Sequence, residues 1–225
     1  MDTGRGGRGT QAPMAIEVRD VAEGLWLWRQ RHFAWQEGND WEPEVSSFAV
    51  ESRGARLLLD PLAPRPDGGE LWQRLDAAPP DAIVILKADH VRDVDLFARW
   101  YDADTYGPML FWPDDVPHGE LEPVYPGLEL PGGLIAQYDG RGFGETPLYL
   151  PDQRALVFAD GLTAPGGTLR VWDTPWHEQR VLPALRALLD LPFEHVLVSH
   201  GEPVHTRAGF EAALARDPWS DWEGD

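Results

Sequence analysis

Short apolar runs separated by turn-forming residues divide the chain into many small segments. Residues 16–28 alternate in places and end in Leu-Trp-Leu-Trp, which predicts a strand. Residues 45–51 and 56–60 predict a hairpin with Arg53 and Gly54 at its turn. In residues 81–86, every residue after Asp81 is apolar, which predicts a strand that is covered on both faces. Further strands are predicted at residues 104–106, 134–138, 147–150, 155–159 and 195–199.

Helical spacing appears between these strands. Residues 69–77 predict a helix that the Pro79–Pro80 pair ends, and period-3.6 spacing predicts another helix over residues 178–189. Two more helices are predicted at residues 93–100 and 210–215. Residues 29–44 and 107–133 show no clear period and predict loops, the first of them a loop or hairpin over the sheet. Both halves place strands before a helix, which is compatible with two packed sheets flanked by helices.

The length of 225 residues suits one α/β domain, and 43% hydrophobic residues suffice for a real core. Residues 1–13 are rich in Gly and Arg and predict a disordered tail, which leaves residues 14–225 as a single domain and Met14 as an alternative start. The tail lacks the apolar segment of a secretory signal, and no apolar run is long enough to span a bilayer. A cytoplasmic location is therefore expected.

The net charge of -19 and the absence of cysteine narrow the function further. Such an acidic surface repels phosphate backbones and anionic lipid, so neither nucleic acid nor a membrane is an expected partner. An unidentified small molecule is the expected ligand, and the oligomeric state stays open. Without cysteine, any transition metal must bind histidine and carboxylate groups, which suits zinc, iron or manganese.

Polar residues follow three of the predicted strands at their ends: Asp89-His90, Asp160-Gly161 and His200-Gly201. Sites of α/β proteins gather at strand ends, where loops bring distant residues together. Two histidines and two aspartates that converge there would make a plausible metal site. The alternative is that each histidine is a hydrogen-bonded structural residue.

The order and setting of these clusters resemble the metallo-β-lactamase superfamily, which includes zinc hydrolases, glyoxalase II enzymes and flavodiiron proteins. Residues 85–90, Ile-Leu-Lys-Ala-Asp-His, fit the motif His-x-His-x-Asp-His, with Ile85 and Lys87 in place of its first two histidines. Residues 140–145 fit the motif Gly-His-x-x-Gly-Glu, with Arg141 in the histidine position. The remaining matches are Leu57-Leu58-Leu59-Asp60, Val157 to Gly161 and Val198 to Pro203.

The resemblance implies a four-layer αββα sandwich, an α/β (α+β) fold of two mixed β-sheets flanked by helices. It also implies two metal sites, of which only one keeps its ligands. All three ligands of the first metal are replaced, whereas the four candidates for the second metal are present: Asp89, His90, Asp160 and His200.

Two functional hypotheses follow from this pattern. In the first, the chain is a hydrolase-like protein with one metal ion (zinc, iron or manganese) acting on an unknown small molecule, and Asp89, Lys87 and Arg141 are its catalytic candidates. In the second, no metal binds and the chain is a non-catalytic binding or scaffolding module. Lys87 and Arg141 would then supply positive charge in place of the metal and pair with Asp89 and Asp160.

Two further alternatives stay open. Lys87 and Arg141 could point to solvent and pair with nothing. Alternatively, the chain could be an ordinary two-metal hydrolase that takes its missing ligands from His32, His118 or His177.

Overall fold

The computed structural model describes residues 16–39, 41–65, 68–142 and 144–220. Its chain begins with a hairpin where the sequence pattern predicted a single strand over residues 16–28. β1 (Glu17–Ala22) and β2 (Leu25–Arg31) pair antiparallel, and Gly24 between them has a φ of 69°. A Cβ atom at Gly24 would lie 2.4 Å from the carbonyl oxygen of Glu51, so only glycine fits this turn. The single-strand prediction was wrong because this glycine reverses the chain.

Within the described residues, the first sheet has seven strands in the order β1 to β7. Its first four strands are antiparallel and its last four are parallel. The predicted hairpin is confirmed, with its turn at Arg53 and Gly54. β2 extends three residues into the predicted loop 29–44, which leaves residues 32–43 as the connection. The remaining strands are β3 (Glu44–Ser52), β4 (Ala55–Leu59), β5 (Ala82–Val84), β6 (Asp104–Gly107) and β7 (Glu122–Pro123).

In the same described part of the chain, the second sheet has five strands in the order β14-β11-β10-β9-β8. β11 and β14 are parallel, and the other pairs are antiparallel. These strands are β8 (Glu129–Leu130), β9 (Leu134–Ala136), β10 (Leu148–Leu150), β11 (Ala155–Phe158) and β14 (His195–Val198). A separate small pair consists of β12 (Leu162–Thr163) and β13 (Arg170–Val171).

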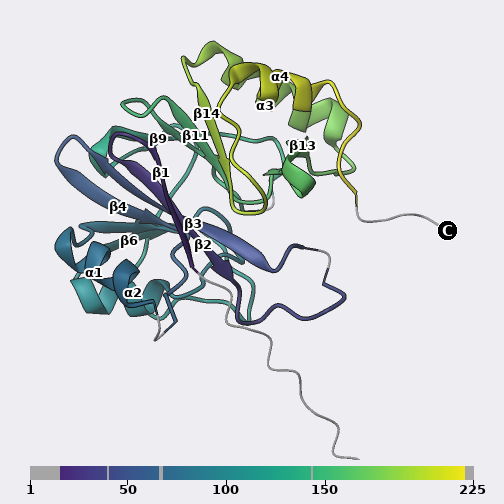
Figure 1. The fold of residues 1–225 in the computed structure, drawn as a ribbon. Coiled ribbons are helices and arrows are strands. Elements are labelled where there is room, and N and C mark those ends of the chain that lie inside the picture. Colours follow the sequence, from purple (N-terminus) through teal and green to yellow (C-terminus); the bar gives the residue numbers. More distant parts are fainter. Residues whose placement is uncertain (1–15, 40, 66–67, 143, 221–225) are drawn as a thin grey trace, which may run out of the picture.

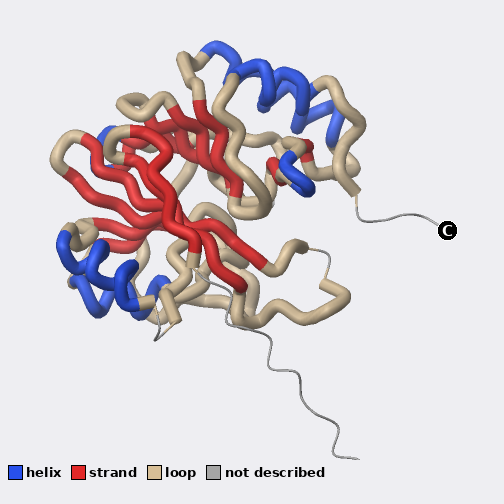
Figure 2. Tube along the Cα trace, in the orientation of Figure 1, coloured by secondary structure: helices blue, strands red, loops and turns tan. Residues whose placement is uncertain are grey.

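Helices cover the outer face of each sheet, as Figures 1 and 2 show. α1 (Gly69–Ala77) and α2 (Val94–Tyr101) lie against the first sheet. α3 (Leu182–Ala187) and α4 (Arg207–Leu214) lie against the second sheet. Short 3₁₀ turns occupy Pro131–Gly133 and Pro165–Gly167.

The helix predicted over residues 178–189 is three segments rather than one. A π-helical turn, His177–Val181, precedes α3, and a 3₁₀ turn, Leu188–Asp190, follows it. Pro183 lies in the first turn of α3. It has no N–H to donate and its ring crowds the preceding turn, which accounts for the wider turn before it.

Alternation along the strands assigns side chains to three apolar layers. Leu57 and Leu59 face the second sheet, whereas Leu58 between them faces α1. Likewise Val157 faces the first sheet, whereas Phe158 faces α4. The molecule is therefore a helix–sheet–sheet–helix sandwich, and its central core lies between the two sheets.

No helix among the described residues has the length and apolar character needed to cross a membrane. The predicted tail at residues 1–13 and the alternative start at Met14 lie outside the described residues.

Candidate functional site

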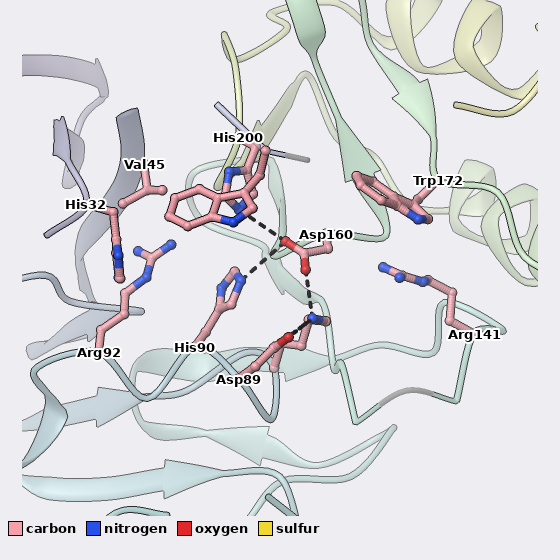
Figure 3. A pocket seen from close by; sticks show the side chains of 11 residues that line it. His32, Val45, Asp89, His90, Arg92, Arg141, Asp160, Trp172 and His200 are labelled. Carbon is pink, nitrogen blue, oxygen red and sulfur yellow. Dashed lines mark hydrogen bonds and ion pairs between the residues drawn. The ribbon is translucent and has the colours of Figure 1, made fainter. Parts of the chain in front are cut away.

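The strand ends of both sheets meet at a pocket of about 390 Å³ (Figure 3). His90 follows β5, Asp160 follows β11 and His200 follows β14. The described residues that line the pocket are His32, Trp41, Val45, Lys87, Asp89, His90, Arg92, Arg141, Asp160, Trp172 and His200. The fold thus brings together side chains that lie 40 to 110 residues apart in the sequence.

His90, Asp160 and His200 point toward a common position. Oδ1 of Asp160 lies 3.2 Å from Nε2 of His90 and 3.3 Å from Nε2 of His200. One ligand atom from each of the three side chains lies within 4.8 Å of the others, and among the described residues this is the group that could hold a metal ion.

Asp60 orients His90 from behind. Its carboxylate is fully buried, with Oδ2 2.7 Å from His90 Nδ1, while Oδ1 accepts the N–H of Leu86 at 2.7 Å. Burial acts to lower the pKa of His90, but the carboxylates of Asp160 and Asp60 outweigh it and raise the pKa to about 9. Asp60 was noted in the sequence only as part of a motif, because a strand-end aspartate alone does not reveal its partner.

Lys87, the only lysine of the chain, lies between two aspartates. Its Nζ is 2.7 Å from Oδ2 of Asp160 and also forms an ion pair with Asp89. Burial acts to lower the pKa of Lys87, but the charges of Asp160 and Asp89 outweigh it, so the pKa is raised and the amine stays protonated. Asp160 therefore presents one oxygen to Lys87 and the other to the two histidines.

Asp89 does not share the position where His90, Asp160 and His200 converge. The N–H of His90 donates to the carbonyl of Lys87 at 2.9 Å, so residues 87–90 form a turn. Asp89 and His90 project differently from this turn (Figure 3). The carboxylate of Asp89 accepts from Nζ of Lys87 instead. The structure thus brings three of the four predicted ligands together and places the fourth beyond the lysine.

Arg141 forms an ion pair with Glu145, whereas the sequence suggested Asp89 or Asp160 as its partner. Arg141 Nη1 lies 3.1 Å from Glu145 Oε2, and both side chains are buried. Burial raises the pKa of Glu145 to about 7, although the charge of Arg141 opposes this. The alternative in which Lys87 and Arg141 point to solvent is wrong, because each is 7% exposed and ion-paired.

Glu145 in turn holds the backbone around Asp160. Its carboxylate accepts the N–H groups of Ala159 at 3.0 Å, Asp160 at 3.1 Å and Gly161 at 2.8 Å. One buried carboxylate therefore fixes the turn that carries Asp160.

The His200 turn is held by the first sheet and by the residue that follows β12. The N–H of Ser46 donates to the carbonyl of Ser199 at 2.8 Å, and that of Ala164 donates to the carbonyl of His200 at 3.0 Å. Arg29 donates to the carbonyl of Gly201 and pairs with Glu202. Burial acts to raise the pKa of Glu202, but Arg29 and Arg19 outweigh it and lower the pKa.

Comparisons with known proteins address the fold. No protein-family model matches the chain, and no curated protein matches it by sequence. A metallo-β-lactamase from Pontibacter korlensis superimposes with a TM-score of 0.65 at 15% identity, covering 90% of this chain and 100% of the other. The chain has the metallo-β-lactamase fold.

Two further solved structures agree with this assignment. The metallo-β-lactamase FIM-1 from Pseudomonas aeruginosa, in its mono-zinc form, gives a TM-score of 0.64 at 16% identity and covers 89% of this chain and 93% of its own. A metal-soaked Flv1 flavodiiron core from Synechocystis gives 0.63 at 18% identity, and this chain covers 61% of its length. The predicted αββα sandwich and the resemblance on which it rested are thus confirmed at the level of the fold.

In this fold, the three histidines of the two-metal alternative do not gather at one position. His32 lines the pocket, where burial and the charge of Arg92 lower its pKa to about 4. The side chain of His118 is 93% exposed and contacts Asp95, and His177 lies buried at the π-helical turn. None of the three belongs to the convergent group found among the described residues.

The convergent residues His90, Asp160 and His200 fit one metal ion. Oδ1 of Asp160 is buried, and although two imidazoles approach it, neither contact has hydrogen-bond geometry. Two imidazole nitrogens and one carboxylate oxygen are a donor set typical of zinc, and the carboxylate on the far nitrogen of His90 is the usual support for such a ligand.

Arg92 and Trp172 are pocket residues that the sequence analysis did not identify. Arg92 has a φ of 47°, and its Nη1 donates to the carbonyls of Ser46 (2.8 Å) and Asp60 (2.7 Å). Trp172 directly follows β13. Neither lies in a pattern that points to a pocket, so only the fold could reveal them.

Proposed function

We propose that this chain is a metal-dependent hydrolase of the metallo-β-lactamase fold that uses a single ion, zinc, iron or manganese, bound by His90, Asp160 and His200. The convergence of their three ligand atoms around the unsatisfied Oδ1 of Asp160 carries the proposal. The pocket volume of about 390 Å³ is within the range of small-molecule sites, which supports a small-molecule substrate. The cytoplasm is the proposed location.

Three protein ligands leave room for a further ligand, as in catalytic rather than structural zinc sites. A bound ion would lower the pKa of a water molecule and polarise a carbonyl or phosphoryl group. Lys87 holds a fixed positive charge at the second oxygen of Asp160, where it can stabilise negative charge that develops on the substrate. Asp89 positions Lys87, and Arg141 acts through Glu145 on the turn that carries Asp160.

Metal analysis tests the proposal directly. Protein purified without a metal-chelating tag and then titrated with zinc should bind one equivalent per chain. His200→Ala and Asp160→Ala should abolish that binding, whereas the exposed His118→Ala serves as the matched control and should retain it. Binding of no zinc, iron or manganese, or unchanged binding in His200→Ala, would overturn the proposal.

A second candidate function is a metal-free binding module, and the Lys87 bridge between Asp89 and Asp160 supports it. In that case Lys87→Met should destabilise the fold strongly, since it leaves two carboxylates without their partner. For the single-metal hydrolase, zinc should restore much of the lost stability of Lys87→Met. Thermal unfolding with and without zinc separates the two functions.

A further inference from the structure

A second space, which we call the side chamber, adjoins the pocket at Lys87. It has a volume of about 230 Å³. Lys87, Arg141 and Trp172 line both the main pocket and the side chamber, so these three side chains form a common wall. The described residues that line the side chamber are Lys87, Trp112, Arg141, Trp172, Asp173, Thr174 and Pro175.

The outer walls of the side chamber are flat and apolar. Trp112 comes from the loop between β6 and β7 and is 58% exposed, and Pro175 lies close to Trp172 in the chain. Covering exposed indole surface with an apolar group is favourable, and aromatic rings add to this by stacking or edge contact. A closed apolar cavity of about 150 Å³ holds benzene, so the side chamber has room for one aromatic ring.

Charge by itself does not separate the two spaces. The main pocket has three cationic side chains, Lys87, Arg92 and Arg141, against the carboxylates of Asp89 and Asp160. The side chamber shares Lys87 and Arg141 and adds one exposed carboxylate, Asp173, at its edge, so cations exceed carboxylates by one in both spaces. The apolar surface of Trp112 and Pro175 is therefore what assigns the flat part of a ligand to the side chamber.

We propose that the side chamber binds an uncharged, flat apolar group of the substrate against Trp112 and Trp172, while the polar group that reacts lies at His90, Asp160 and His200. The substrate class is accordingly a small polar or anionic compound with one aromatic or comparably flat substituent. The placement of the reacting group rests on the proposed hydrolase function, whereas the occupancy of the side chamber does not.

Phenylphosphonate and methylphosphonate are matched probes, because they share one head group and differ in the ring. Binding is followed by the indole N–H signals of Trp112 and Trp172 in ¹⁵N-labelled protein, with and without zinc. Phenylphosphonate should shift the Trp112 signal and methylphosphonate should not, whereas Trp172 lines both spaces and its signal should respond to either probe. Trp112→Ala should weaken phenylphosphonate binding about tenfold and leave methylphosphonate unchanged.

Trp100→Ala is the matched control, since Trp100 lies on α2, is 66% exposed and lines neither space. The proposal is overturned if phenylphosphonate leaves the Trp112 signal unshifted, or if Trp112→Ala and Trp100→Ala behave alike. If the ring-dependent shifts occur equally without and with zinc, the side chamber is supported and the single-metal hydrolase loses support. The two proposals therefore fail through different observations.

Discussion

At the scale of single residues, the contact between Asp60 and His90 decides which imidazole nitrogen faces the pocket. Asp60 uses one oxygen for the N–H of Leu86 and the other for Nδ1 of His90. A carboxylate accepts hydrogen bonds, so it keeps a proton on Nδ1. Nε2 is then the nitrogen whose lone pair a metal ion can use.

Asp60→Asn should reduce zinc affinity by about 10- to 100-fold. An asparagine that keeps its carbonyl on the Leu86 N–H presents its NH₂ group to His90 Nδ1 and favours a proton on Nε2. Competition with a chromophoric zinc chelator measures the affinity. Ser47→Ala is the control and should change it much less, because the Ser47 hydroxyl bonds the backbone carbonyl of Asp60 and not its carboxylate, beside contacts to Leu62 and Arg92. Equal affinities for the wild type and Asp60→Asn would contradict this role.

At the scale of elements, the turn after β11 depends on Glu145. Its carboxylate accepts three backbone N–H groups and pairs with Arg141. The strand end is therefore fixed by a side chain from another part of the chain rather than by its own sequence.

Glu145→Ala should lower the free energy of unfolding by about 3–5 kcal/mol, because it leaves a buried guanidinium and three amides without their acceptor. Urea denaturation measures the change. Glu145→Gln keeps the volume and one acceptor oxygen and should cost less. A loss below 1 kcal/mol for the alanine variant would show that the turn is held by other contacts.

Asp95 in the first turn of α2 gives a pH-dependent prediction. Its carboxylate accepts the N–H of His118 at 3.0 Å and that of Gly119 at 3.2 Å. Burial acts to raise the pKa of Asp95, but the hydrogen bond with the His118 ring (Nδ1 to Oδ2, 2.8 Å) and these backbone bonds outweigh it and lower the pKa below its usual value. A carboxyl group with a lowered folded-state pKa stabilises the fold above its unfolded pKa of about 3.9, and this is lost as the pH falls through the folded value.

Asp95→Asn should therefore be less stable than the wild type by about 1 kcal/mol at pH 7, and the difference should shrink as the pH falls below about 3.9 and through the lowered folded-state pKa. Chemical denaturation at a series of pH values provides the measurement. Asp114→Asn, which removes another acid from the chain, is the control for general charge effects. A difference that grows as the pH falls would contradict the assignment.

The sequence predicts regular elements better than it predicts the site. The hairpin around Arg53 and the helix at residues 69–77 follow from turn and helix signals that act locally. The π-helical turn comes from Pro183, which a pattern of apolar spacing does not register, and the reversal at Gly24 depends on its close approach to the backbone of Glu51. The local motif also predicted that Asp89 and His90 bind the same metal. In the structure, Asp89 contacts Lys87 and His90 contacts Asp60, because neighbours in a turn point in different directions.

At the scale of the whole molecule, the site lies where the two sheets are joined. The N–H of Ser46 on β3 donates to the carbonyl of Ser199 beyond β14 at 2.8 Å. Arg29 on β2 adds contacts to Gly201 and Glu202. The position of His200 relative to His90 is thus a property of how the sheets pack.

Arg29→Met should weaken zinc binding about tenfold, or about 1.4 kcal/mol, because the His200 turn loses one of its bonds to the first sheet and keeps the one from Ser46. Isothermal titration with zinc measures this loss. Arg19→Met is a matched control. Arg19 also pairs with Glu202, but among the described residues the side chain that bonds the carbonyl of Gly201 is Arg29. If both variants weaken zinc binding equally, the effect comes from Glu202 rather than from the turn.

Because the chain has a single lysine, acylation of that side chain reports on one site. Apart from the terminal amine, Lys87 is the only target for an acylating reagent, and it is protonated, ion-paired and 7% exposed. Folded protein should take up label at the terminus alone, and a second label should appear at the rate at which the pocket opens or the sheets separate. Mass spectrometry of timed acylation would thus follow the opening of this one site without any engineered probe.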